Sequence, residues 1–175
     1  QYARNNLQWN RRNGLFSEAG QYSGINATDW SWAALWMDFD NDGNKDLFVS
    51  NGIPKRMNDI DYINFVSNEE LQEKLRNGSV EDKDMALVNK FPEIKIPNQF
   101  FSNKGNLAFQ DVTDSIDQNK PTFSNGSVYA DLDNDGDLDI VVNNINDPVL
   151  LYENKANSKQ ENTFTSIQLK GAENN

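Results

Sequence analysis

Two short stretches of the chain carry an aspartate at nearly every second position, around a single glycine. The first reads Asp-Phe-Asp-Asn-Asp-Gly-Asn-Lys-Asp over residues 38–46, and the second reads Asp-Leu-Asp-Asn-Asp-Gly-Asp-Leu-Asp over residues 131–139. Calcium takes roughly six to eight oxygen ligands, which a tight loop of alternating aspartates can supply. The spacing therefore predicts two calcium ions, in what we name the first acidic loop (residues 38–46) and the second acidic loop (residues 131–139).

Carboxylates occupy positions 1, 3, 5 and 9 of both loops, and the backbone carbonyl at position 7 is expected to face the ion. A glycine at position 6 permits the sharp reversal of the chain. The candidate ligands of the first ion are Asp38, Asp40, Asp42, Asn44 and Asp46. Those of the second ion are Asp131, Asp133, Asp135, Asp137 and Asp139.

A solvated acidic turn is the alternative to a metal site. Two carboxylates about 4 Å apart repel by roughly 4 kcal/mol at an effective dielectric constant of about 20, so four in one loop favour a bound cation. An EF-hand is excluded, because its glutamate position is here Val49 or Val142. Magnesium is less suitable, since it dehydrates reluctantly. Positions 7 and 8 read Asn-Lys in the first loop and Asp-Leu in the second, so the more negative second loop is expected to bind calcium more tightly.

The two loops belong to a repeat with an offset of 93 residues. At this offset Phe16 falls on Phe109, and Trp36 falls on Tyr129. An ungapped match that runs from Phe16 to the end of the first acidic loop indicates that one structural unit occurs twice.

Each unit has the pattern of short β-strands around its acidic loop. The apolar runs beside the loops do not alternate with polar residues, which is typical of strands covered on both faces, as in the stacked blades of a propeller. The expected strands are residues 33–37, 47–50, 98–102, 107–112, 127–130 and 139–143. The sequence thus predicts a mainly β fold, consisting of blades of a calcium-loop β-propeller of which only part is present, with a helical insertion.

The insertion spans residues 53–97, and it either packs over the rim of the blade or forms a cap that binds a partner. Its expected helices are residues 58–66, 69–75 and 80–91, with Asn-Gly at 77–78 as a helix stop. The predicted organisation is a first repeat at 1–52, the helical insertion at 53–97, a second repeat at 98–154 and the start of a following blade or domain at 155–175.

The composition restricts the chemistry largely to oxygen ligands. There is no cysteine for a disulfide or a thiolate zinc site, and no histidine, the commonest general base. A net charge of −11 argues against a nucleic-acid partner, which would need a basic surface. No apolar run is long enough to cross a bilayer, so no transmembrane segment is expected.

The residues around the loops, 34–51 and 126–144, resemble the FG-GAP and VCBS repeats, the calcium-loop blades of integrin-α-like β-propellers. Residues 109–113 and 150–154 look like outer strands of that family. Residues 58–62, after Asn-Gly at 51–52, are similar to a segment in surface proteins of Bacteroidota in which such a propeller precedes an ASPIC/UnbV domain. Residues 165–171 look like the first strand of that domain.

The resemblance implies a propeller of about seven blades, of which this chain holds about two. The remaining blades are expected in the same longer chain or in neighbouring chains, at an extracellular or outer-membrane surface location. We therefore expect a non-catalytic binding or adhesion module for a glycan or a protein, with two calcium ions. The alternative is part of a propeller-based polysaccharide lyase or of another carbohydrate-active enzyme, and no residue is assigned a catalytic role.

Overall fold

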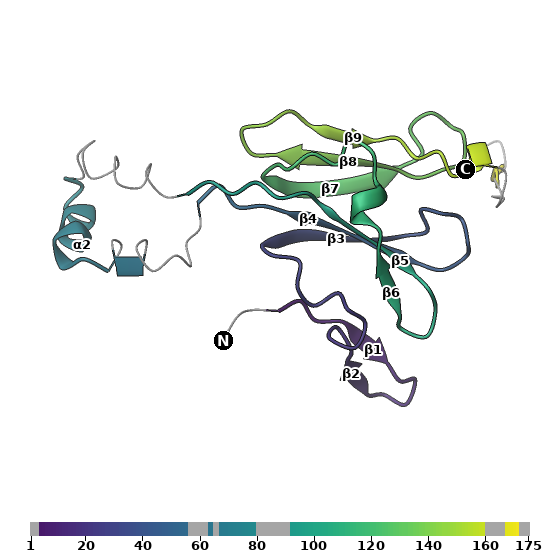
Figure 1. The fold of residues 1–175 in the computed structure, drawn as a ribbon, viewed down its shortest axis with the longest axis horizontal. Helices are drawn as coiled ribbons and strands as arrows, with labels where there is room; N and C mark the ends of the chain where they lie inside the picture. Colours follow the sequence, from purple (N-terminus) through teal and green to yellow (C-terminus); the bar gives the residue numbers. More distant parts are fainter. Residues whose placement is uncertain (1–3, 56–62, 65–66, 80–91, 160–166, 172–175) are drawn as a thin grey trace.

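This computed structural model describes residues 4–55, 63–64, 67–79, 92–159 and 167–171. Among these residues the chain is mainly β, with three antiparallel sheets and few helical turns (Figure 1), which confirms the fold class predicted from the sequence. The strands are β1 (Gln8–Asn10), β2 (Phe16–Glu18), β3 (Ser31–Met37), β4 (Asp46–Asn51), β5 (Gln99–Asn103), β6 (Phe109–Asp111), β7 (Ser124–Ala130), β8 (Asp139–Asn144) and β9 (Leu150–Tyr152). The helices are α2 (Glu69–Arg76) and the 3-10 helices η1 (Thr113–Ser115) and η2 (Asn157–Lys159).

The 93-residue repeat is also a repeat of hydrogen-bond register. Strand β3 pairs with β4 through Ser31 and Asn51, and β7 pairs with β8 through Ser124 and Asn144, at the same offset. In both pairs the serine hydroxyl donates to the asparagine side-chain oxygen, at 3.1 Å in the first and 2.9 Å in the second. An irregularity in register follows each serine at the same place. One structural unit therefore occurs twice.

The same offset relates two hairpins in which the strands are shorter. In β1–β2, Gln8 lies opposite Glu18, and in β5–β6, Phe101 lies opposite Asp111. The second hairpin extends the sheet of β3 and β4, which gives the strand order β3-β4-β5-β6. By register, the hairpin β1–β2 is thus equivalent to the outer half of a four-stranded blade.

The boundaries of the sheets do not coincide with the boundaries of the two repeated sequence units. Strands β5 and β6 lie beyond the insertion in sequence, yet they complete the sheet that β3 and β4 begin. Strand β9 occupies in the third sheet the position that β5 occupies in the second, and among the described residues it has no outer neighbour. The described residues therefore comprise an outer half-blade, one four-stranded blade and three strands of a further blade.

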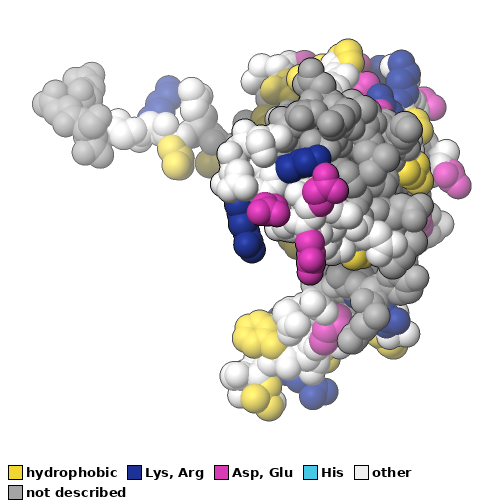
Figure 2. Space-filling view, turned by 90° about the vertical axis from the view of Figure 1, so that its left-hand side faces the viewer, with side chains coloured by type: hydrophobic (Ala, Val, Ile, Leu, Met, Phe, Trp, Pro, Cys, Tyr) yellow, Lys and Arg dark blue, Asp and Glu magenta, His cyan; other side chains and the backbone are white. Residues whose placement is uncertain are grey.

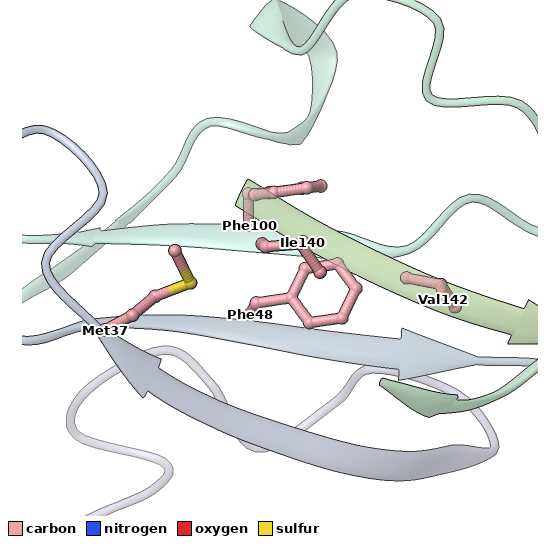
Figure 3. Packing of buried hydrophobic residues seen from close by; sticks show 5 residues of the cluster. All are labelled: Met37, Phe48, Phe100, Ile140 and Val142. Carbon is pink, nitrogen blue, oxygen red and sulfur yellow. The ribbon is translucent and has the colours of Figure 1, made fainter. Parts of the chain in front are cut away.

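The main core lies where the four-stranded and three-stranded sheets face each other. Met37, Phe48 and Phe100 project from the first of these sheets, and Ile140 and Val142 project toward them from β8 (Figure 3). The rings of Phe48 and Phe100 meet edge to face at 4.9 Å between centroids, an arrangement that the charge distribution of aromatic rings favours. That pair lies within the four-stranded sheet, and the ring of Phe100 also meets Tyr152 of β9 edge to face at 5.3 Å, which packs one blade against the next.

Strand β4 is buried on both faces, as its non-alternating sequence predicts. Phe48 faces the three-stranded sheet, while Leu47 and Val49 contribute to a second cluster with Ile25 and Phe101. Every residue of β4 is buried. The apolar run therefore forms the centre of a stack of layers, which is the arrangement of propeller blades.

Helix α2 of the insertion stands apart from the sheets, whereas the end of the insertion contacts them through the bridge of Ile96 with Thr122. Helix α2 confirms the helix expected at residues 69–75, and Gly78 follows its end with a positive φ of 64°. Figure 1 shows α2 away from all three sheets, so for this helix the expected packing over the blade rim is wrong. Most of segment 58–66 and all of segment 80–91 lie outside the described residues. No helix within the described ranges has the length and apolar character needed to cross a bilayer.

The surface carries charges of both signs. On the face shown in Figure 2, acidic and basic side chains of the described residues lie close to one another. Ion pairs of this kind include Lys95 with Asp147 at 2.7 Å. The described part of this face therefore does not form the uniformly basic surface that a nucleic acid would require.

Gly52 sits at the junction between the two larger sheets and generates a stability prediction. Its φ is 147°, and an added Cβ would lie 2.6 Å from the Cα of Phe123. We expect Gly52→Ala to lower the free energy of unfolding by about 3 kcal/mol or more, because strain adds to a backbone clash. Chemical denaturation would measure this.

The matched control is Gly105→Ala, which also changes a glycine with positive φ but has open space around the added methyl group. Its cost should stay near 1 to 2 kcal/mol, roughly the strain of the left-handed conformation alone. Equal losses of unfolding free energy in the two variants would show that the junction between the sheets rearranges to accommodate the added methyl group.

Candidate metal centre

The two acidic loops connect equivalent strands in neighbouring sheets. The first acidic loop joins β3 to β4, and the second joins β7 to β8. Strands β3 and β7 pack beside each other, so both loops emerge from the same end of the paired sheets. Adjacent aspartate-rich loops are therefore a consequence of stacking two copies of one unit.

In the first acidic loop, three of the predicted ligands come together. Carboxylate oxygens of Asp38, Asp40 and Asp42 all lie within 4.8 Å of one another. The loop also folds back on its own carboxylates. The amide of Asp42 donates to Asp38 Oδ1 at 3.0 Å, and the amide of Gly43 donates to Asp38 Oδ2 at 2.9 Å. The left-handed φ of 89° at Gly43 makes this reversal possible.

The second acidic loop has the same geometry. Oxygens of Asp131, Asp133 and Asp135 again lie within 4.8 Å of one another. The amide of Gly136 donates to Asp131 Oδ2 at 3.1 Å, and the amide of Asp135 donates to Asp133 Oδ1 at 3.2 Å. Three carboxylates held this closely, with no basic side chain supplied by the loop itself, are a donor set that suits a hard divalent cation.

The fourth carboxylate of each loop, at position 9, has a different environment. Asp46 is buried, and its two oxygens accept hydrogen bonds from the amides of Phe39 at 3.0 Å and Asn103 at 2.8 Å. Asp139 is also buried and accepts from the amides of Leu132 at 3.0 Å and Asn154 at 2.8 Å. Each of these side chains ties the start of its loop to the end of the third strand of its sheet.

The two residues at position 7 also differ from each other. The side chain of Asn44 stays within its own loop and donates to Asp42 Oδ2 at 3.1 Å. The side chain of Asp137 is fully buried and accepts from the side chain of Asn41, in the other loop, at 2.6 Å. The carboxylate of Asp137 therefore points toward the first acidic loop.

Two asparagines that support the loops were missed in the sequence. Asn103 Nδ2 donates to the carbonyl of Lys45 at 2.9 Å, and Asn154 Nδ2 donates to the carbonyl of Phe39 at 2.8 Å. Asn154 thus links the end of β9 to the first acidic loop. The available signal was the dipeptide Asn-Lys, which occurs at the end of β5 at 103–104 and shortly after β9 at 154–155.

Burial changes the acidity of one carboxyl group in particular. The pKa of Asp46 is raised from 3.8 to about 6, first because the group is buried away from water. The amides of Asn103 and Phe39 oppose the shift, while the negative charges of Asp40 and Asp42 add to it. The fold therefore favours the protonated form of the Asp46 carboxyl group relative to the unfolded chain.

These features can be compared with known families. Residues 1–49 match the family model of the FG-GAP-like repeat. The matched FG-GAP-like segment contains the hairpin β1–β2, strand β3 and the whole first acidic loop, so it covers one of the two predicted sites. A search of curated proteins found no match to the chain.

The raised pKa of Asp46 predicts a pH dependence of stability. Because the pKa is higher in the folded state than in the unfolded chain, the protonated form favours folding. The contribution of Asp46 to the free energy of unfolding is complete below about pH 4 and is lost as the pH rises through about 6. At about 1.4 kcal/mol per pKa unit, the loss amounts to roughly 3 kcal/mol.

Denaturation of the wild type and of Asp46→Asn, with a chelator present, would isolate this contribution. Asparagine cannot ionise, so the variant should gain stability relative to the wild type between pH 4 and 6. Parallel pH profiles for the two proteins would contradict the assignment.

Proposed function

We propose that this chain is a calcium-binding segment of a β-propeller that acts as a non-catalytic binding or adhesion module for a glycan or a protein. The observation that carries the proposal is the recurrence of one carboxylate cluster at the same place in two stacked sheets. Three carboxylates within 4.8 Å of one another repel, and a bound cation would offset this repulsion in both loops. The FG-GAP-like match over residues 1–49 supports a propeller-type repeat.

Calcium suits the loops better than other ions do. The described clusters offer oxygen donors only, and the chain contains neither cysteine nor histidine, the preferred ligands of zinc. Asp38, Asp40 and Asp42 supply the first ion, and Asp131, Asp133 and Asp135 supply the second. The backbone carbonyls of Asn44 and Asp137 remain proposed ligands. Asp46 and Asp139 would join only by exchanging a backbone hydrogen bond for the ion.

The location and the assembly follow from the repeat. FG-GAP repeats typically occur in extracellular or cell-surface proteins, so we propose a secreted or surface-exposed protein. The half-blade β1–β2 and the outer edge of β9 would pair with further blades of a longer chain, which would cover their unpaired backbone groups. The finer resemblance to Bacteroidota proteins with an ASPIC/UnbV domain remains a prediction.

Catalysis of polysaccharide cleavage is the second candidate, and one cleft favours it. A cavity of about 480 Å³ lies beside Asp40 and is lined in part by Ser102, Lys104 and Lys155. Two lysines next to a bound cation would suit an acidic sugar. Incubation with uronate-containing polysaccharides, followed by ultraviolet absorbance of unsaturated products, would test for lyase activity. Binding without product on glycan arrays would favour the adhesion module.

The calcium proposal predicts a metal-dependent melting temperature. An ion that binds only the folded state stabilises it by about 2.7 kcal/mol at a hundredfold excess over its dissociation constant. We expect millimolar calcium to raise the melting temperature by several degrees relative to a chelator, and magnesium to raise it less. Identical melts with and without calcium would contradict metal binding.

Substitutions should then separate the two sites. Asp40→Ala and Asp133→Ala should each reduce the calcium stoichiometry from two to one in calorimetric titration. Asp117→Ala removes an exposed carboxylate outside both loops and should leave the stoichiometry at two. A loss in this control as large as in the loop variants would show that the ions bind to general surface charge.

A further inference from the structure

One hydrogen bond joins the two acidic loops directly. The side-chain Nδ2 of Asn41, at position 4 of the first loop, donates to Oδ1 of Asp137, at position 7 of the second, over 2.6 Å. The two residues are 96 positions apart in the sequence. This contact exists only because the two sheets pack with their loops side by side.

Asp137 is the centre of a small network. It is fully buried, and its second oxygen accepts the amide of Asn157 at 2.7 Å. The side chain of Asn157 donates in turn to the carbonyl of Asp135, at position 5 of the second loop, over 2.8 Å. Among the described residues no lysine or arginine forms an ion pair with Asp137. Hydrogen bonds alone therefore offset the burial of this carboxylate. The loss of one of these hydrogen bonds would leave a buried polar atom without a partner and lower the stability of the fold.

The bridge is not a general property of the repeated unit. At the 93-residue offset, Asn134 corresponds to Asn41 and Asn44 corresponds to Asp137. Asn41 and Asn134 share the same left-handed backbone, with φ of 57° and 63°. The described residues show no hydrogen bond from the side chain of Asn134 to the other loop, and that of Asn44 stays within its own loop. The link therefore depends on these particular side chains.

We infer that Asn41 and Asp137 are positioning residues that couple the two metal sites, so that an ion in one loop raises the affinity of the other loop. The inference rests on the proposed calcium binding. An ion held by Asp40 and Asp42 fixes the segment that carries Asn41. Asn41 then fixes Asp137, whose backbone carbonyl is a proposed ligand of the second ion. The first ion thus orders part of the second loop, so the second ion binds with a smaller loss of conformational entropy.

Charge acts against the coupling. Two calcium ions in neighbouring loops repel each other, which by itself would make the sites antagonistic. The carboxylate of Asp137 at the contact between the loops would strengthen each site without changing this repulsion, so the coupling must come from the ordering through Asn41. The charge of Asp137 therefore lies beside both loops, and the tighter binding expected for the second loop stays a prediction.

Calorimetric titration of the 175-residue chain with calcium tests the coupling. The affinity of the second site is measured in the wild type and in Asp40→Ala, and that of the first site in the wild type and in Asp133→Ala. We expect each site to lose about fivefold in affinity when the other is disabled, since binding linkage is reciprocal. Asn41→Gly should remove this loss in both directions while both sites still bind.

The matched control is Asn134→Gly, which makes the same change at the same backbone conformation without touching the bridge. It should leave the coupling intact. Asp137→Asn, which keeps the shape but turns one acceptor into a donor, should abolish it. Circular dichroism would confirm that each variant is folded.

The possible outcomes separate this inference from the proposed function. Absence of any calcium binding by the folded wild type would overturn both. Two sites with affinities that do not depend on each other, or that weaken each other, would overturn the coupling alone. Equal effects of Asn41→Gly and Asn134→Gly would also overturn it, because loop flexibility would then account for the change.

Discussion

The buried carboxylates of Asp46 and Asp139 are the interaction on which the rest of the structure depends. Each accepts one amide from the start of its loop and one from the end of the third strand. A buried carboxylate without such donors would be costly, so the loop and the strand are held in one arrangement. Because the third strand of the first sheet comes after the insertion, this contact also joins segments that lie far apart in the sequence.

The hydrogen bonds of these two buried carboxylates explain how one aspartate-rich motif serves two purposes. The carboxylates at positions 1, 3 and 5 converge at the open end of the loop, where mutual repulsion favours a cation. The carboxylate at position 9 faces inward and satisfies backbone amides that the tight turn leaves without partners. The aspartate at position 9 has this structural role with or without a metal, so its recurrence in both loops says nothing about ion binding. The other three carboxylates accept amides of their own loop, and the proposed cation binding would offset the repulsion among them.

Much of this arrangement follows from local sequence, and the remainder depends on contacts between distant segments. The acidic loops, the hairpin at β5–β6 and helix α2 could be predicted, because each depends on neighbouring residues. The membership of β5 in the sheet of β4 could not, since the insertion separates them and only the pairing of Phe48 with Phe100 reveals it. The inward turn of Asp46 was also hidden, because an aspartate at position 9 reads equally well as a ligand.

The position of Asp137 shows where counting charges along a sequence fails. In the sequence this residue adds one negative charge to the second loop, and the count of charges assigns it to that loop. In the fold its side chain is buried against Asn41, and it becomes a contact between the two acidic loops. Stacking two copies of one unit thus creates a contact that neither copy contains. Repetition therefore fixes the geometry of each loop, while the differences between the copies determine how the loops influence each other.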